Sequence, residues 1–388
     1  MKSEKLRIAL FHPWLKSKGG AERVVLEFLK NTIHEVEVYT WVYLRESTFS
    51  EFKQFNVKVI APKFFENFSN KFILRGLFLF TSLFSKIPLD KYDLFFISTS
   101  GVGEFITFRN YKKGKTFAYV HSILRDSYKD NVKWNLKYRY GNWISRIIYL
   151  FFVNFYRILE AISWRRIDVA IFNSSLSQNR AWNSKLLEDK KSFVVYPPTS
   201  ILGKNIGRET QNYFLYVSRF NYNKRQDVLL DAWREFMKEY KNYKLILAGS
   251  VEGKGYFEKI NQVAKEVGNV EIKTNLSDSE LKKLYSGCSA VLFVSYLEDF
   301  GIVPFEAMSF GKALIAVDGG GYMDLAKKYK GLIKLKEKFD NKEMSEEILN
   351  GLRYFVLNRG EMKCKPTKFS ELLPSFFSKS IEDIFKKE

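Results

Sequence analysis

The fold of this chain is decided by the segment AVLFVSYLEDFGIVPFEAMSFGKALIAV, residues 290–317. Its β-rich ends, Ala290–Val294 and Ala313–Val317, are predicted to be strands, and a loop and a short helix lie between them. Pro304 suits the first turn of that helix, and Gly311 suits its end. Strands that alternate with helices form parallel sheets covered by helices on both faces, so the segment predicts an α/β fold.

The same alternation recurs in two series along the chain. Longer helical patterns, such as Ala21–Asn31 and Gln226–Tyr240, follow short β-rich runs in both series. We therefore expect two doubly wound domains, each with its own parallel sheet. The other expected strands are Leu6–Phe11, Glu35–Thr40, Val57–Ile60, Leu94–Ile97, Thr116–Val120, Val169–Phe172 and Val194–Tyr196 in the first series, and Tyr213–Val217, Lys244–Ala248 and Val270–Ile272 in the second.

A domain boundary and an anionic partner follow from the composition. The chain has 388 residues, which exceeds one ordinary core, and Pro197-Pro198 precede a polar linker over 199–210. Its net charge of +20 predicts a partner that is a nucleic acid, a phosphorylated ligand or an acidic membrane surface. The two cysteines, Cys288 and Cys364, are isolated, which argues against disulfides and zinc clusters. Since no signal-peptide pattern precedes the first strand, a cytoplasmic location is expected.

Ligand-binding side chains are expected just after the strands, because ligands of doubly wound sheets bind at the carboxyl ends of the strands. Gly19-Gly20 opens the first helix of the chain. This pair either lets a ligand approach the backbone or only forms a tight turn. His121 follows the strand Thr116–Val120, where it is either a ligand contact or a capped core residue.

The second series carries charged residues at the equivalent positions. Arg219 and Lys224 follow its first strand, where two cations can hold a diphosphate or can be solvated surface charges. Glu298 and Glu306 flank Phe300–Ile302, whose amides are expected to point into the loop, and this arrangement suits a ligand with many hydroxyls. Interaction with the helix dipole would explain Glu306 alone, but it would not explain Glu298.

Taken together, these motifs resemble those of the retaining GT-B glycosyltransferases of family 4, in the expected order and across nearly the whole chain. The sequence motif EDFGIVP followed by EA is similar to the motif of a subgroup of bacterial O-antigen mannosyltransferases. After the histidine, however, SILR replaces the proline-containing segment of that subgroup. The matching segments are Gly19-Gly20-Ala21-Glu22-Arg23, Tyr119-Val120-His121-Ser122 with Arg125, Val195-Tyr196-Pro197-Pro198, Ser218-Arg219 with Lys224-Arg225, and Glu298 to Glu306.

The resemblance implies two Rossmann-like domains that face each other across a cleft. Residues 1–197 would bind the acceptor, residues 198–367 would bind the nucleotide-sugar, and a C-terminal helix over 368–388 would pack back on the first domain. The implied reaction is the retaining transfer of a hexose, mannose from GDP-mannose, to a glycan or lipid-linked acceptor.

The resemblance also implies roles for the matched residues. Arg219 and Lys224 would hold the leaving diphosphate, and Glu306 would accept hydrogen bonds from the ribose. The implied catalytic residues are His121, Glu298, Arg219 and Lys224; the implied donor contacts are Gly20, Arg219, Lys224, Glu298, Phe300, Gly301, Ile302 and Glu306; the implied acceptor contacts are Gly19 and Arg125. The matched motifs contain no nucleophile and the chain has no DxD, so we expect front-face attack without a metal or other cofactor.

Two basic and aromatic segments, 63–86 and 128–166, predict contact with an anionic membrane at its cytoplasmic face. The alternative is that their aromatic side chains belong to the core. The apolar runs within them, Phe72–Phe84 and Ile147–Tyr156, fall short of the ~20 residues that a spanning helix needs, so no span is expected.

Other functions compete with this interpretation. Charge and aromatic content also suit a nucleic-acid-binding protein, but no RRM, KH or helix-turn-helix signature is present, so no nucleic-acid partner is expected. Within the same fold, the alternatives are a UDP-sugar-dependent transferase, an epimerase, a phosphorylase or a non-catalytic scaffold. A phosphorylase would need a pyridoxal-phosphate lysine that the sequence does not identify. Intact Arg219, Lys224, Glu298 and Glu306 argue against the scaffold.

Overall fold

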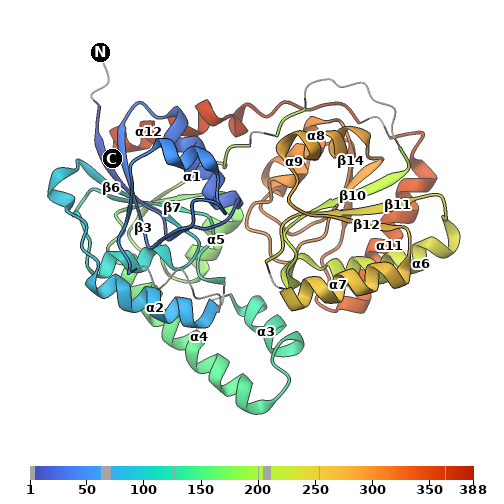
Figure 1. Ribbon diagram of the computed structural model, residues 1–388, viewed down its shortest axis with the longest axis horizontal. Helices are drawn as coiled ribbons and strands as arrows, with labels where there is room; N and C mark the ends of the chain where they lie inside the picture. Colours follow the sequence, from blue (N-terminus) through green and yellow to red (C-terminus); the bar gives the residue numbers. More distant parts are fainter. Residues whose placement is uncertain are drawn as a thin grey trace. The chain divides into compact units, whose positions relative to one another are not determined.

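The computed structural model describes residues 5–62, 71–125, 128–199, 201–203, 211–252, 254–362 and 364–388. The chain divides into two compact units, Met1–Pro198 with Glu371–Glu388, and Thr199–Ser370. Each unit contains one large parallel sheet flanked by helices (Figure 1). The expected α/β fold with two parallel sheets is therefore confirmed.

The first unit is built on a seven-stranded sheet with the order β5-β3-β1-β6-β7-β8-β9. Its neighbouring strands are parallel, and Ile8 of β1 lies opposite Val36 of β3 and Leu94 of β6. The central strand β6 is buried along its whole length, as expected for a sheet covered on both faces. The strands are β1 (Arg7–Phe11), β3 (Glu35–Thr40), β5 (Val57–Val59), β6 (Leu94–Thr99), β7 (Thr116–Val120), β8 (Val169–Phe172) and β9 (Lys191–Val194), with β2 (Trp14–Leu15) and β4 (Val42–Tyr43) in a separate small sheet.

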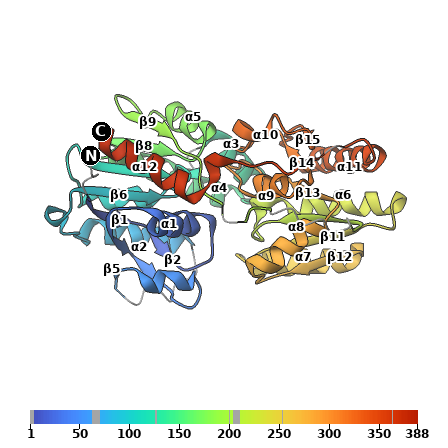
Figure 2. The ribbon, with the colours of Figure 1, turned by 90° about the horizontal axis from the view of Figure 1, so that it is seen from above.

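The last helix of the sequence belongs to this first unit. Phe385 of α12 packs its ring against Phe28 of α1 and Phe96 of β6, and Glu382 accepts hydrogen bonds from Thr32 Oγ1 (2.8 Å) and the Ile33 amide (2.9 Å). Figure 2 shows α12 running over the same unit as β6 and β8. The helices of this unit are α1 (Gly20–Asn31), α2 (Lys71–Phe84), α3 (Lys129–Tyr138), α4 (Trp143–Trp164), α5 (Ser175–Asn183) and α12 (Pro374–Lys387), with 3₁₀ turns η1 (Ser50–Gln54), η3 (Leu89–Lys91) and η4 (Gly103–Phe108).

The second unit is built on a six-stranded parallel sheet with the order β12-β11-β10-β13-β14-β15. Trp233 and Phe236 of α6 pack edge-on against Phe214 of β10 in its core. The strands are β10 (Tyr213–Val217), β11 (Lys244–Ala248), β12 (Val270–Lys273), β13 (Ala290–Phe293), β14 (Ala313–Val317) and β15 (Leu332–Leu335). The helices are α6 (Gln226–Glu239), α7 (Lys254–Val267), α8 (Asp278–Gly287), α9 (Val303–Ser309), α10 (Met323–Ala326) and α11 (Asn341–Asn358), with the 3₁₀ turn η6 (Tyr222–Lys224).

Three features differ from the sequence-based expectations. Strand β15 was not predicted, and β9 ends at Val194 instead of Tyr196. Helix α4 has 22 residues, and by length and mean hydropathy it could cross a membrane, although a third of its apolar window is buried in the protein. The apolar run Ile147–Tyr156 is bounded by Arg146 and Arg157, but the helix continues past both residues and so reaches the length of a membrane span.

Candidate active site

Three neighbouring strands of the first unit end at a hydrogen-bonded pair of histidines. His12 follows β1, Ser98 lies at the end of β6, and His121 follows β7. The Ser98 hydroxyl lies 3.0 Å from His12 Nδ1 and 2.8 Å from His121 Nε2. Since the hydroxyl has one proton, it can donate to only one ring and must accept from the other, so it couples the tautomers of the two imidazoles.

Both imidazoles are held neutral. Burial lowers the pKa of His12 to about 4. Burial, and then the proximity of His12, lower the pKa of His121 to about 3. The Asn173 amide donates a 2.7 Å hydrogen bond to the His121 carbonyl and helps to fix this loop. His121, predicted to be catalytic, can therefore act near pH 7 as a neutral hydrogen-bonding group but not as a cation.

A carboxyl group that favours its protonated form lies in the same region. Glu104 of η4 is fully buried and accepts a hydrogen bond from the Thr99 hydroxyl. That hydroxyl in turn accepts the amides of Gly101 (3.2 Å) and Gly103 (3.0 Å). Burial raises the pKa of Glu104 to about 7. The two imidazoles at this edge of the first sheet are thus neutral near pH 7, and Glu104 is partly protonated.

The predicted glycine pair has two different surroundings. Gly19 is the N-cap of α1, and a Cβ there would lie 2.3 Å from Glu22 Oε2, whose carboxylate also accepts a 3.0 Å hydrogen bond from Ser17. A Cβ on Gly20 would meet no atom within 4 Å. Open space therefore borders Gly20, the predicted donor contact, whereas internal packing explains Gly19. Arg125, the other predicted acceptor contact, is partly buried in the loop that follows β7.

An ion pair dominates the corresponding edge of the second unit. Lys224 Nζ pairs with Glu298 Oε2, and the two side chains are only 13% and 14% exposed. Lys224 ends the turn that follows β10, and Glu298 lies in the loop that follows β13, so two adjacent strands of the sheet supply the pair. The structure thus brings together the residues predicted to hold the diphosphate and the sugar hydroxyls. Arg219, the other predicted cation, is half exposed and lies 3.5 Å from Glu252 instead.

A buried arginine fixes the turn that carries Lys224. Arg225 has left-handed backbone angles (φ 54°, ψ 35°) and a fully buried side chain that lies over the ring of Tyr296. Its guanidinium donates to Glu337 Oε1 (2.6 Å) and to the Lys338 carbonyl (2.8 Å). Desolvation raises the pKa of Glu337, although Arg225 opposes this shift. Because the next residue in the chain is so constrained, the Lys224 side chain starts from a fixed position.

The loop between Glu298 and Glu306 is shaped by one glycine. Gly301 has φ 86°, and a Cβ there would lie 2.8 Å from the Phe293 ring, so only glycine fits. The Phe300 ring is buried and stacks on Phe305. Ile302 is the N-cap of α9 and Pro304 lies in its first turn, as predicted.

Glu306 is buried in the first turn of α9, where it accepts a 2.5 Å hydrogen bond from Tyr285 of α8. Burial and the Glu306 carboxylate raise the pKa of Tyr285 well above its usual range, so its hydroxyl stays protonated. Tyr285 therefore fixes the orientation of the carboxylate that was predicted to meet the ribose.

Sequence reasoning missed several members of these two sites. His12 was detectable, since it directly follows a predicted strand, as His121 does. Nothing in the sequence singled out Ser98, Glu104, Tyr285 or the buried partner Glu337. Their roles depend on which strands and helices become neighbours.

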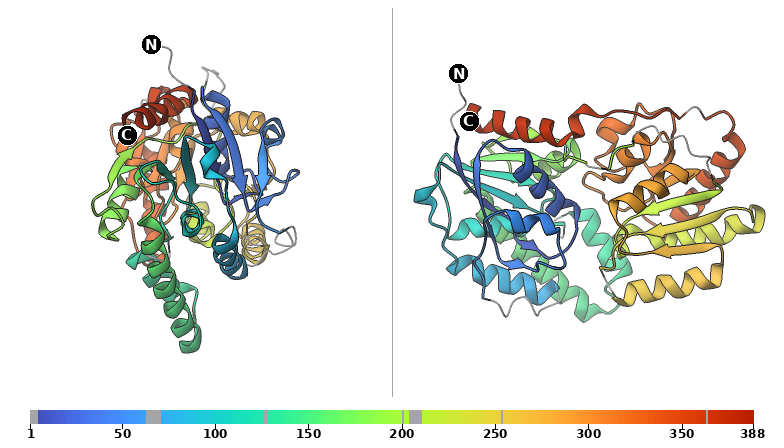
Figure 3. Two further views of the ribbon diagram at one scale, coloured as in Figure 1. Left: turned by 90° about the vertical axis from the view of Figure 1, so that its left-hand side faces the viewer. Right: turned by 45° about the horizontal axis from the view of Figure 1, so that its top comes forward.

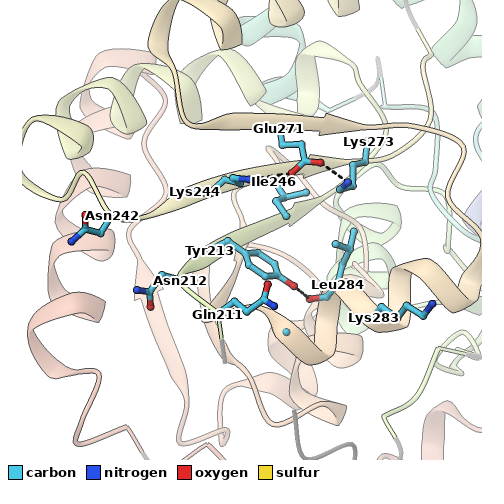
Figure 4. Close-up of a pocket in the computed structure, with 11 residues that line it drawn as sticks. Gln211, Asn212, Tyr213, Asn242, Lys244, Ile246, Glu271, Lys273, Lys283 and Leu284 are labelled. Carbon is cyan, nitrogen blue, oxygen red and sulfur yellow. Dashed lines mark hydrogen bonds and ion pairs between the residues drawn. The ribbon is translucent and has the colours of Figure 1, made fainter. Parts of the chain in front are cut away.

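One pocket among the described residues holds none of the predicted residues. It measures about 760 Å³ and lies between α8 and the β10–β12 part of the sheet (Figure 4). Lys244 and Lys273, which line it, both pair with Glu271. These two lysines share one carboxylate, Lys283 lines the pocket as well, and none of the residues predicted to bind the donor does, so we do not assign the active site there. In the described part of the chain, no three His, Cys, Asp or Glu side chains are grouped to hold a metal ion.

Known proteins resemble this chain in both sequence and fold. Residues 200–360 match the family of glycosyl transferases group 1. The chain is 24% identical to alpha-1,3/1,6-mannosyltransferase ALG2 of Candida glabrata, over 84% of this chain and 79% of that protein. It is also 24% identical to the GDP-Man:Man(3)GlcNAc(2)-PP-Dol alpha-1,2-mannosyltransferase of Dictyostelium discoideum, over 81% of this chain and 72% of that protein.

Among solved structures, Anabaena HepE in complex with UDP and glucose superposes with a TM-score of 0.68. The sequences are 17% identical, and the match covers 99% of this chain and all of that one. At this identity the likeness concerns the fold. The predicted resemblance and the predicted fold are both confirmed.

Proposed function

We propose that this glycosyltransferase of the GT-B fold transfers mannose from GDP-mannose to a lipid-linked glycan with retention of configuration. Its residues 200–360 match the family of glycosyl transferases group 1. Two of its relatives are named as mannosyltransferases, and the name of one contains a GDP-mannose donor and a dolichol diphosphate acceptor. The acceptor would be met at the cytoplasmic face of a membrane.

The observation that carries the proposal is the Lys224–Glu298 ion pair. A nucleotide-sugar has a diphosphate beside a sugar with several hydroxyls, and the pair offers a cation beside a carboxylate. In the ligand-free protein each group compensates the charge of the other. On donor binding, the diphosphate would replace Glu298 at Lys224, and sugar hydroxyls would donate to the released carboxylate.

In the proposed mechanism, Lys224 and Arg219 stabilise the negative charge that develops on the departing diphosphate. The acceptor hydroxyl attacks the anomeric carbon from the face that the diphosphate leaves, and a phosphate oxygen takes its proton. Glu298 orients the sugar and does not form a bond to it. A trapped covalent adduct between the sugar and Glu298 would overturn this mechanism.

A donor screen tests the function directly. We expect GDP-mannose, with a lipid diphosphate acceptor, to give nucleotide release, and we expect GDP to raise the melting temperature more than UDP or an oligonucleotide does. Release from a UDP-sugar alone would favour the UDP-dependent alternative. Protection by the oligonucleotide alone would overturn the enzyme assignment of this site.

Two variants separate the roles of the glutamates. Glu298→Ala should abolish transfer, because the sugar loses its orienting carboxylate. Glu306→Ala should mainly raise the KM for the donor, because a ribose contact contributes binding and takes no part in the chemistry. Equal activity of both variants and the wild type would contradict both roles.

Activity that persists in excess chelator is also expected, and a loss restored by Mn²⁺ would refute the metal-free proposal.

A further inference from the structure

Helix α4 carries two apolar stripes on opposite sides. One is buried against its own unit, where Asn135 donates to Tyr149 Oη (2.8 Å) and the Leu124 amide donates to Glu160 Oε1 (2.7 Å). The second stripe recurs every three or four residues and is exposed; Phe151 is 66% exposed and Ile158 is 61% exposed. Its members are Ile144, Ile147, Ile148, Phe151, Phe155, Ile158 and Ile162.

A second exposed apolar patch lies on α2. Phe80, Leu83 and Phe84 are exposed there, and the rings of Phe80 and Phe84 are 4.8 Å apart. Helices α2 and α4 both pack on η4, and they lie at the lower end of the first unit in the two views of Figure 3. Side chains of residues 71–75, and all of 63–70 in the predicted membrane segment, lie outside the described residues.

The exposed charges near these stripes are mainly positive, and Asp130 on α3 is the acidic exception. Lys129, Lys133 and Lys137 recur every four residues on α3 and are exposed, as are Arg146 and Arg157 on α4. Glu160, one of the two acidic residues of 128–166, is buried. An apolar stripe flanked by exposed cations complements a bilayer whose headgroups are anionic.

We infer that α4 lies in the plane of an anionic lipid bilayer, with its exposed stripe among the acyl chains and its other stripe still packed on the protein. From Ile144 to Ile162 the stripe extends ~27 Å, at ~1.5 Å per residue. A spanning orientation would place Arg146, Asn154 and Arg157 in hydrocarbon and would separate Tyr149 and Glu160 from their partners. The inference rests on the proposed function in one respect: a lipid-linked acceptor explains why the protein meets a lipid surface.

Depth measurements test the orientation. Three single-cysteine variants, Ile144→Cys, Phe151→Cys and Ile162→Cys, are made in a Cys364→Ser background, because Cys288 is buried, and are labelled with a polarity-sensitive dye. With phosphatidylcholine–phosphatidylglycerol vesicles, we expect all three labels to shift to the blue and to be quenched equally by shallow spin-labelled lipids. Deep quenching at Phe151 with shallow quenching at both ends would indicate a span and overturn the inference. No shift at any position would overturn it as well.

Vesicle flotation tests the surface itself. The double variant F151N/I158N should bind these vesicles about tenfold less well than the wild type, because two large apolar side chains no longer leave water. The matched control is Leu357→Asn on α11, a leucine that is 77% exposed in the other unit, and it should bind as the wild type does. The inference would be contradicted if F151N/I158N and the wild type bound the vesicles equally well. It would also be contradicted if light scattering showed a dimer without lipid whose interface is this stripe. Protection by GDP is measured in the same variants, so a failure of lipid binding is distinguishable from a failure of the proposed function.

Discussion

The two parallel sheets end in edges of opposite chemical character. In the first unit, His12, Ser98 and His121 form a chain of neutral hydrogen-bonding groups, and burial raises the pKa of the nearby Glu104 carboxyl to about 7. In the second unit, Lys224–Glu298 and Arg225–Glu337 are ion pairs. Both sites lie at the carboxyl ends of parallel strands. The first contains mainly neutral hydrogen-bonding groups, and the second contains ion-paired side chains.

The difference assigns each edge a kind of ligand. An anionic diphosphate is best held by a cation in a fixed position. In a partly buried site, a cation stays charged only when a carboxylate lies beside it. A sugar hydroxyl carries no charge, so neutral imidazoles and hydroxyls can meet it without a desolvated ion. The second edge should therefore respond to the charge of a ligand and the first to pH.

The largest expected effect concerns the charged edge. Lys224→Met should lower kcat/KM by about 10²–10³-fold, because the developing phosphate charge loses its buried cation. Arg219→Met, the control, should cost about tenfold or less, because Arg219 is half exposed and its charge is screened by water. Steady-state kinetics with the donor measure both values. Equal losses would mean that burial of the cation does not decide its contribution.

The second prediction concerns the support of that edge. Arg225→Met should lower the free energy of unfolding by about 3 kcal/mol, because it leaves Glu337 without its buried partner. The double variant R225M/E337Q should recover most of that loss, since both charges are then removed. Urea denaturation measures the difference. If the double variant is no more stable than the single one, the ion pair is not what holds the Lys224 turn.

The third prediction concerns the pH dependence of stability that His12, at the neutral edge of the first sheet, should cause. The pKa of His12 falls from its ordinary value of 6.5 to about 4 in the folded protein, so between those values the unfolded chain binds a proton that the native state does not. Native stability should therefore decrease as the pH falls through this window, by about 3 kcal/mol from this residue. His12→Gln should remove that part of the slope in denaturation curves recorded at several pH values. An unchanged slope would show that His12 is not buried as a neutral ring.

The smallest effect concerns the hydroxyl that orients Glu306. Tyr285→Phe removes a single hydrogen bond and should weaken GDP binding by about 1 kcal/mol, or roughly fivefold, without changing kcat. Calorimetric titration with GDP measures the change. A loss confined to kcat would show instead that Glu306 acts in the chemistry.

The sequence specified most of the fold and about half of each site. Every strand of the two large sheets except β15 was visible, because buried parallel strands are short apolar runs bounded by turns, and Pro304 and Gly311 marked the limits of α9. The exposed stripe of α4 was not resolved in the sequence, because the helix is apolar on two sides and its period is therefore obscured. Residues such as Ser98, Glu337 and Tyr285 acquire a role only from a neighbour distant in the sequence, so no local pattern could identify them.

The return of the last helix to the first unit has a consequence for how the protein is made on the ribosome. Phe28, Phe96 and Phe117 precede the second unit in the sequence, but their packing partner Phe385 follows it. The second unit is continuous in sequence from Thr199 to Ser370, so all of it has emerged before α12 does. The nascent chain can therefore complete its second unit while the first unit still lacks the helix that covers these three rings.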